Sequence, residues 1–275
     1  MTAKITFIGG GNMASSLVGG LLANDYPAQQ INVVEPDPQK RQQLQQQFGI
    51  ATSDDSPGAV ASADVVVLAV KPQILQTVCR QLAAPVQQRQ PLVISIAAGI
   101  RSTDIDRWLG GDCALVRCMP NTPALVQTGA TGLFANARVD ATQKQLATDV
   151  LEAAGITLWV EREDLLDAVT AVSGSGPAYF FLLMECMQTA GEQLGLDADS
   201  ARQLSLQTAL GAARMATAGH DDPATLRNKV TSKGGTTEAA INCFQQNGLE
   251  QLVLRALTAA RDRAIELADE LGKDA

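Results

Sequence analysis

A glycine-rich turn close to the N-terminus constrains the fold of this chain more than any other feature. An apolar run at residues 4–9 leads into Gly9-Gly10-Gly11-Asn12-Met13-Ala14, after which apolar residues recur at helical spacing. The pattern Gly-x-Gly-x-x-Ala falls on Gly9, Gly11 and Ala14. The first glycine permits a tight turn, the second lets a pyrophosphate approach the backbone, and the third small residue keeps helix and strand close. The order strand, turn, helix therefore predicts a dinucleotide-binding unit rather than a merely glycine-rich turn.

Strand-like and helix-like segments alternate over the first 162 residues. Apolar runs typical of buried strands occupy residues 4–9, 31–34, 64–70 and 91–97, with further candidates at 114–118, 132–134 and 156–160. Helical segments at residues 39–48 and 73–82 lie between them. Such runs belong to parallel sheets that are covered on both faces. We therefore predict an α/β domain of the Rossmann type, doubly wound, over residues 1–162.

Residues that follow the predicted strands are candidate cofactor ligands, because such folds bind ligands outside the carboxyl ends of their strands. Proline or glycine punctuation alone would explain each loop, but together the loops favour a cofactor crevice. The candidates from these loops and from the glycine turn are Gly9, Gly11, Asn12, Met13, Ala14, Glu35, Ala69, Val70, Lys71, Pro72, Ala97 and Asn121.

From residue 163 onward the strand-like runs cease. Helical segments rich in alanine and leucine follow at residues 165–171, 178–194, 200–217, 238–246 and 252–271, so we predict an all-α domain over residues 163–275. Its second segment is apolar on more sides than one small domain can cover, which predicts a homodimer or higher homo-oligomer formed through these helices. The apolar residues are Tyr179, Phe180, Leu182, Leu183, Met184 and Met187.

A second glycine-rich loop lies near the C-terminal end, where residues 230–241 read Val-Thr-Ser-Lys-Gly-Gly-Thr-Thr-Glu-Ala-Ala-Ile. Gly234 and Gly235 permit a sharp turn, and Thr236 or Thr237 is expected to cap the helix that follows. The first N–H groups of that helix lack intrahelical partners, so the loop suits a small carboxylate. An ordinary capped helix start has the same sequence pattern.

Charge and cysteine content exclude several classes of partner. The net charge of −8 and the isoelectric point near 4.7 argue against nucleic acid or an anionic membrane surface as partners. Neither a charged leader nor an apolar stretch approaching the roughly 18 residues of a membrane span is present, so we expect a cytoplasmic protein. The five cysteines are scattered without C-x-x-C spacing, which predicts buried free thiols and no metal site.

In their order along the chain, these motifs resemble the pyrroline-5-carboxylate reductase family over essentially the whole length. The matching segments are the glycine turn at 9–14, residues 69–72, 97–99, 117–123 and 173–179, and the loop at 230–241. The resemblance implies the last step of proline synthesis: hydride transfer from NADPH or NADH to the imine carbon of 1-pyrroline-5-carboxylate, which yields L-proline.

The resemblance also implies residue roles. The substrate carboxylate would be held by Ser232, Gly235 and Thr236, and the Thr237 hydroxyl would meet the ring nitrogen, which makes Thr237 the expected catalytic residue. Ser56 falls where the family often has a polar residue on the ribose side. The imine can bind already protonated, so no strong protein acid is required, and His220 is expected to be exposed.

Two positions depart from the family pattern. Glu35 ends the second strand, where an acidic side chain favours the ribose hydroxyls of NAD, whereas the family commonly uses NADPH. Lys40 and Arg41 could compensate, so the choice of cofactor stays open. Lys229 stands where relatives often have asparagine, which leaves the hydrogen bonding of the adjoining loop open.

Two other functions compete with the reductase. A beta-hydroxyacid-type dehydrogenase shares the two-domain plan but requires a lysine and an asparagine where this chain has Phe180 and Met184. A non-catalytic dinucleotide sensor would bind the cofactor without turnover, and a hydroxyl-lined carboxylate loop argues against it.

Overall fold

The computed structural model describes residues 2–273, which divide into two compact units. Unit 1 contains the described residues up to Ser175 together with those from Ala260 onward, and unit 2 is Gly176–Ala259. The predicted domain boundary between residues 162 and 163 differs from this division and stays a prediction.

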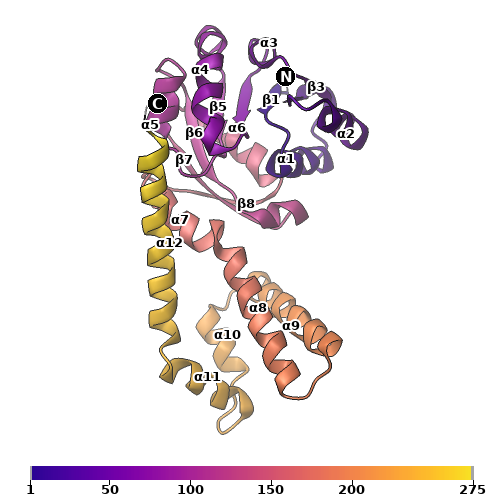
Figure 1. The fold of residues 1–275 in the computed structure, drawn as a ribbon, viewed down its shortest axis with the longest axis vertical. Helices are drawn as coiled ribbons and strands as arrows, with labels where there is room; N and C mark the ends of the chain where they lie inside the picture. Colours follow the sequence, from indigo (N-terminus) through magenta and orange to yellow (C-terminus); the bar gives the residue numbers. More distant parts are fainter. Residues whose placement is uncertain (1, 274–275) are drawn as a thin grey trace. The chain divides into compact units, whose positions relative to one another are not determined.

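An eight-stranded sheet forms the centre of unit 1 (Figure 1). Its strand order is β3-β2-β1-β4-β5-β6-β7-β8, and all neighbours are parallel except β6 and β7. The chain winds from β1 to β3 in one direction and then crosses to β4 on the other side of β1, as in a doubly wound fold. The predicted fold class is confirmed. The strands are β1 Ile5–Ile8, β2 Ile31–Val34, β3 Ala51–Ser53, β4 Val65–Leu68, β5 Leu92–Ser95, β6 Leu115–Met119, β7 Gly129–Ala135 and β8 Gly155–Trp159.

Helices cover both faces of this sheet, and the strand period of two divides the core between the faces. In β4, Val65 and Val67 join the cluster that contains α1, while Val66 and Leu68 join the cluster that contains α4. Both sets are fully buried, which is why a continuous apolar run marks this strand. The helices on the first face are α1 Asn12–Ala23, α2 Pro38–Phe48 and α6 Ala141–Glu152; those on the second are α3 Ser56–Val60, α4 Pro72–Arg89 and α5 Ser102–Trp108.

Short elements after β8 also belong to unit 1. α7 (Leu165–Val169) packs against β6 and β7 and continues into a π-helical turn, Thr170–Gly174. Just before α7, the Glu163 carboxylate lies 3.0 Å from the buried guanidinium of Arg117 in β6. Single 3₁₀ turns occur at Ala28–Gln30 and Thr122–Val126.

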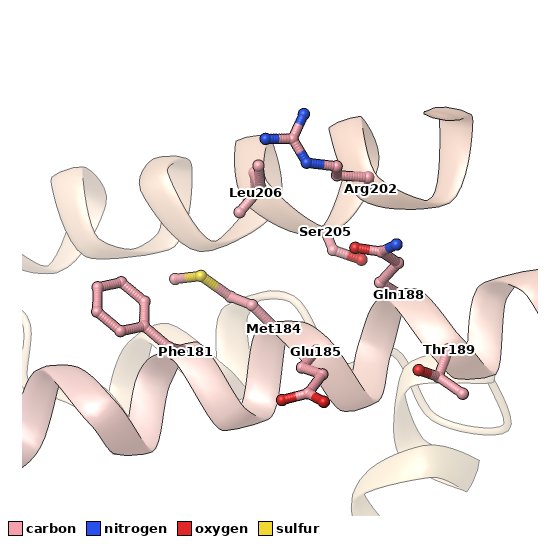
Figure 2. Close-up of a pocket in the computed structure, with 8 residues that line it drawn as sticks. All are labelled: Phe181, Met184, Glu185, Gln188, Thr189, Arg202, Ser205 and Leu206. Atoms are coloured by element: carbon pink, nitrogen blue, oxygen red, sulfur yellow. The ribbon is translucent and has the colours of Figure 1, made fainter. Parts of the chain in front are cut away.

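Unit 2 is helical. It contains α8 Gly176–Gln193, α9 Ala198–Ala218, α10 Pro223–Lys229, α11 Thr236–Gln246 and the first part of α12 Leu249–Leu271. α8 and α9 lie side by side, and Figure 2 shows a pocket between them that is lined by Phe181, Met184 and Arg202 among others. Phe180 is 63% exposed and Leu183 49%. In the single chain, the face of α8 that carries Phe180 and Leu183 is therefore apolar and exposed.

The last turns of α12 return to unit 1. Ala264 and Ala268 are buried, and Asp269 lies 2.6 Å from Arg101, in the segment between β5 and α5. Because the end of α12 and all of α7 pack in this unit, the compact units divide after Ser175 and again within α12.

The cysteines follow the same division. Cys79, Cys113 and Cys118 are buried in unit 1, as predicted, and burial raises the pKa of the Cys79 thiol to about 12. Cys186 and Cys243 are exposed, so the prediction is wrong for these two, which lie on unit 2 helices that the single chain leaves uncovered. Among residues 2–273, no helix is long and apolar enough to cross a membrane.

Candidate active site

The glycine turn lies where β1, β2 and β4 end. Gly9 has φ +104°, and its N–H donates to the carbonyl of Val34 at 2.8 Å. A Cβ at this position would lie 2.6 Å from the carbonyl oxygen of Ala69, so both the backbone conformation and the space require glycine. The turn therefore packs directly against the loop that follows β4.

α1 begins immediately after this turn, and its N-terminus is open. Gly11 is the N-cap and supplies no side-chain hydrogen bond, and a Cβ on Gly11 would meet no atom within 4 Å. The first N–H groups of a helix, here those of Asn12 and Met13, have no intrahelical partner, and the first turn holds no acidic side chain. Ala14 is buried against the sheet, 1% exposed. These features fit the pyrophosphate of a dinucleotide.

The other predicted cofactor residues lie at the same edge of the sheet. Ala69, Val70 and Lys71 connect β4 to α4, which begins at Pro72, and the buried Ala97 follows β5. Ser56 is the first residue of α3, after β3. Since β1 to β5 are mutually parallel, their carboxyl ends meet at one edge. Contacts of these residues with a bound cofactor stay predictions.

The second glycine-rich loop connects α10 to α11 in unit 2. Gly234 has φ +73°, and Gly235 is the N-cap of α11, with its own N–H donating to Ser232 O at 3.0 Å. Thr236 and Thr237 are the first two residues of α11, so the prediction that one of them caps the helix is wrong. Both side chains are exposed, and both N–H groups lack an intrahelical partner.

Glu238 is a residue of this loop region that sequence reasoning missed. Its Oε2 accepts a hydrogen bond from the Gly234 N–H at 2.7 Å. Glu238 is the third residue of α11, the position from which a glutamate commonly reaches back to a free amide ahead of the helix. The spacing Gly-Gly-Thr-Thr-Glu contains this signal.

Comparison with known proteins decides the family. Residues 163–267 match the model described as pyrroline-5-carboxylate reductase dimerisation, and residues 4–99 match NADP oxidoreductase coenzyme F420-dependent. A pyrroline-5-carboxylate reductase of Pseudomonas aeruginosa is 54% identical over 272 residues, which cover 99% of each chain. This chain belongs to the pyrroline-5-carboxylate reductase family.

Solved structures of pyrroline-5-carboxylate reductases agree. The Coxiella burnetii protein has a TM-score of 0.95 at 47% identity and covers 98% of this chain and 99% of its own. A Plasmodium falciparum pyrroline carboxylate reductase with NADP bound has a TM-score of 0.83 at 26% identity. The match covers 97% of this chain and 98% of the Plasmodium chain. The predicted family, the oxidoreductase class and the use of NADPH or NADH are confirmed.

The match to the reductase dimerisation model also confirms the prediction of a homo-oligomer. Phe180 and Met184, which stand where a beta-hydroxyacid-type dehydrogenase needs lysine and asparagine, lie on α8, and neither can transfer a proton.

Asn121 uses its side chain within the fold. It is 9% exposed; its Nδ2 donates to Ser173 O at 3.0 Å, and its Oδ1 accepts from the Ala130 N–H at 2.9 Å. The side chain therefore holds the turn after β6 against the π-helical turn and β7. Any cofactor contact by Asn121 would come from its remaining N–H groups and its carbonyl, and stays a prediction.

Lys229 does not enter the loop that it precedes. Its Nζ lies 2.6 Å from Asp221, ahead of α10. At the start of the loop, the Thr231 hydroxyl donates a hydrogen bond back to Arg227 O in α10 at 2.6 Å. His220 is exposed, as expected. Among the described residues, no group of three or more His, Cys, Asp or Glu is placed to hold a metal ion.

Proposed function

We propose that this chain reduces 1-pyrroline-5-carboxylate to L-proline with NADPH or NADH, and that the loop between α10 and α11 holds the substrate carboxylate. The observation that carries the proposal is the N-terminus of α11, which has no side-chain cap and is flanked by the hydroxyl-bearing residues Ser232, Thr236 and Thr237. Membership of the pyrroline-5-carboxylate reductase family supports the same reaction.

The carboxylate is bound by backbone and side chain together. The N–H groups of Thr236 and Thr237 and the Ser232 hydroxyl are donors, and the Glu238 carboxylate in the first turn of α11 accepts from the Gly234 N–H and not from them. The Gly235 N–H joins them when it exchanges its bond to Ser232 O for one to the substrate. Such donors fix the orientation of the ring as well as its charge.

Thr237 acts at the ring nitrogen. The substrate enters as the protonated imine, and its N–H donates to the Thr237 hydroxyl oxygen, which holds the C5 carbon in one orientation. The reduced nicotinamide, when bound, supplies the hydride that adds to this carbon. The C=N π electrons then become the nitrogen lone pair, so the reaction needs no acid from the protein.

We also propose that the chain works in the cytoplasm on this small molecule and has no nucleic-acid partner. The net charge of −8 supports this, because a nucleic-acid surface needs clustered basic residues.

The test is steady-state reduction of 1-pyrroline-5-carboxylate, followed by the absorbance of the reduced nicotinamide. Thr237→Ala should lower kcat by about tenfold or more, because the ring loses its orientation. Thr217→Ala is the matched control: it removes an exposed threonine hydroxyl that bonds only to carbonyls of its own helix, α9. The control should keep wild-type kinetics.

Two results would count against the proposal. A folded wild-type chain that binds the dinucleotide but oxidises neither NADH nor NADPH with this substrate would support the sensor instead. Wild-type kinetics in Thr237→Ala would remove Thr237 from the site.

A further inference from the structure

The carboxylate of Glu35 is fixed beneath the glycine turn. Glu35 is 7% exposed; its Oε2 accepts from the Gly10 N–H at 3.0 Å, and its Oε1 accepts from the Asp37 N–H at 3.1 Å. A Cβ on Gly10 would lie 3.3 Å from the same Oε2. The negative charge therefore lies against the backbone of the turn, at the carboxyl end of β2.

In a doubly wound fold, this place is where the adenosine ribose of a dinucleotide lies when its pyrophosphate rests on the glycine turn. A carboxylate has about four acceptor positions, and the two amides use two of them. The remaining lone pairs suit the 2′- and 3′-hydroxyls of the ribose, which donate hydrogen bonds. A 2′-phosphate brings two negative charges to the same place, so it is repelled.

The guanidinium of Arg41 does not pair with the Glu35 carboxylate. Instead, the Arg41 Nη1 donates to the backbone carbonyls of Glu35 at 2.7 Å and Pro36 at 2.9 Å, and its Nη2 lies 3.2 Å from the Asp54 carboxylate. Residues 35–55 together carry four acidic side chains and two basic ones. The segment that follows β2 therefore carries a net negative charge.

We propose that Glu35 is the residue that sets cofactor specificity in this chain, and that it makes the chain bind NADH more tightly than NADPH. The proposal deepens the proposed function, and rests on it, by choosing between the two cofactors. Arg41 has a separate role, which is to hold the β2–α2 loop in place through the backbone carbonyls of residues 35 and 36.

The experiment is calorimetric titration of the full chain with NADH and with NADPH, in the absence of substrate. The wild-type chain should bind NADH at least about tenfold more tightly. Glu35→Gln keeps the size and one acceptor oxygen but removes the charge, and should reduce this ratio by about tenfold. Asp37→Asn is the matched control, because it removes a charge from the same loop but keeps the cap of α2; its ratio should change by less than about twofold. Arg41→Met should weaken both cofactors alike.

Three results would overturn the proposal: wild-type binding of NADPH as tight as that of NADH, an unchanged ratio in a folded Glu35→Gln variant, or a selective loss of NADPH binding in Arg41→Met. If circular dichroism shows that the Glu35→Gln variant is unfolded, the ratio of the NADH and NADPH affinities of the wild-type chain tests the proposal by itself. Binding that favours NADH without turnover would refute the proposed function but not this inference, and turnover without the preference would refute only this inference.

Discussion

Single glycines and polar side chains around the candidate site differ in how far their roles can be predicted from sequence. Gly9, Gly11 and Ala14 were predictable because a backbone constraint leaves a fixed spacing in the sequence. The structural role of Asn121 was not predictable, since its side chain bonds to the carbonyl of Ser173, which is 52 residues away in the sequence. Glu35 was located correctly at the end of β2, but its bond to the Gly10 amide depends on the folded turn.

Asp104 gives a prediction at the same scale. It is 8% exposed, and burial raises its pKa above the ordinary value of 3.8, although Arg107 and Arg101 oppose the shift. The folded state therefore holds the proton to higher pH than the unfolded state does. The free energy of unfolding falls as pH rises from the ordinary pKa of 3.8 through the raised pKa of the folded state. Asp104→Asn removes the penalty and should raise the melting temperature at pH 7, with the gain vanishing below pH 3.8. Thermal denaturation across a pH series measures this, and a gain that is independent of pH would contradict it.

At the scale of elements, the buried strands and long helices were predictable because apolar runs and apolar periodicity mark them. β3 was missed because Ala51–Ser53 has three residues and no apolar run. α6 was missed although its capping box, Asp140 with Gln143, was a usable signal. The antiparallel pairing of β6 and β7 was not predicted, although their connection, residues 120–128, is shorter than the roughly twelve or more residues that a crossover between parallel strands needs.

The packing of α1 yields a matched pair of substitutions. A Cβ on Gly20 would lie 1.9 Å from the carbonyl oxygen of Ala153, whereas one on Gly19 would lie 3.4 Å from Phe48, an ordinary contact. Gly20→Ala should therefore lower the free energy of unfolding by about 1–3 kcal/mol through overpacking. Gly19→Ala should raise it by up to about 1 kcal/mol, because alanine suits a helix interior better. Chemical denaturation compares the two, and equal effects would refute the close contact.

At the scale of the whole molecule, we propose that the uncovered apolar face of α8 packs against a second copy of the chain. The apolar composition predicted this face, and the exposed Phe180 and Leu183 lie one helical turn apart on it. The division of α12 between the two units was not predictable, because its periodic pattern is continuous from end to end.

Replacing both Phe180 and Leu183 by glutamate should give a folded monomer, since charges at an apolar interface are strongly unfavourable. Gln193→Glu, which adds one charge at the exposed end of α8, is the control and should leave the oligomer intact. Size-exclusion chromatography with light scattering reports the mass. A double variant that keeps the wild-type mass would place the interface elsewhere.

The most direct test of the account is a crystal structure of the chain with its expected product, L-proline. We predict that the proline carboxylate lies within hydrogen-bonding distance of the N–H groups of Thr236 and Thr237 and of the Ser232 hydroxyl, with the ring nitrogen at the Thr237 hydroxyl. Proline bound away from residues 231–237, in a chain that still reduces 1-pyrroline-5-carboxylate, would contradict the central claim.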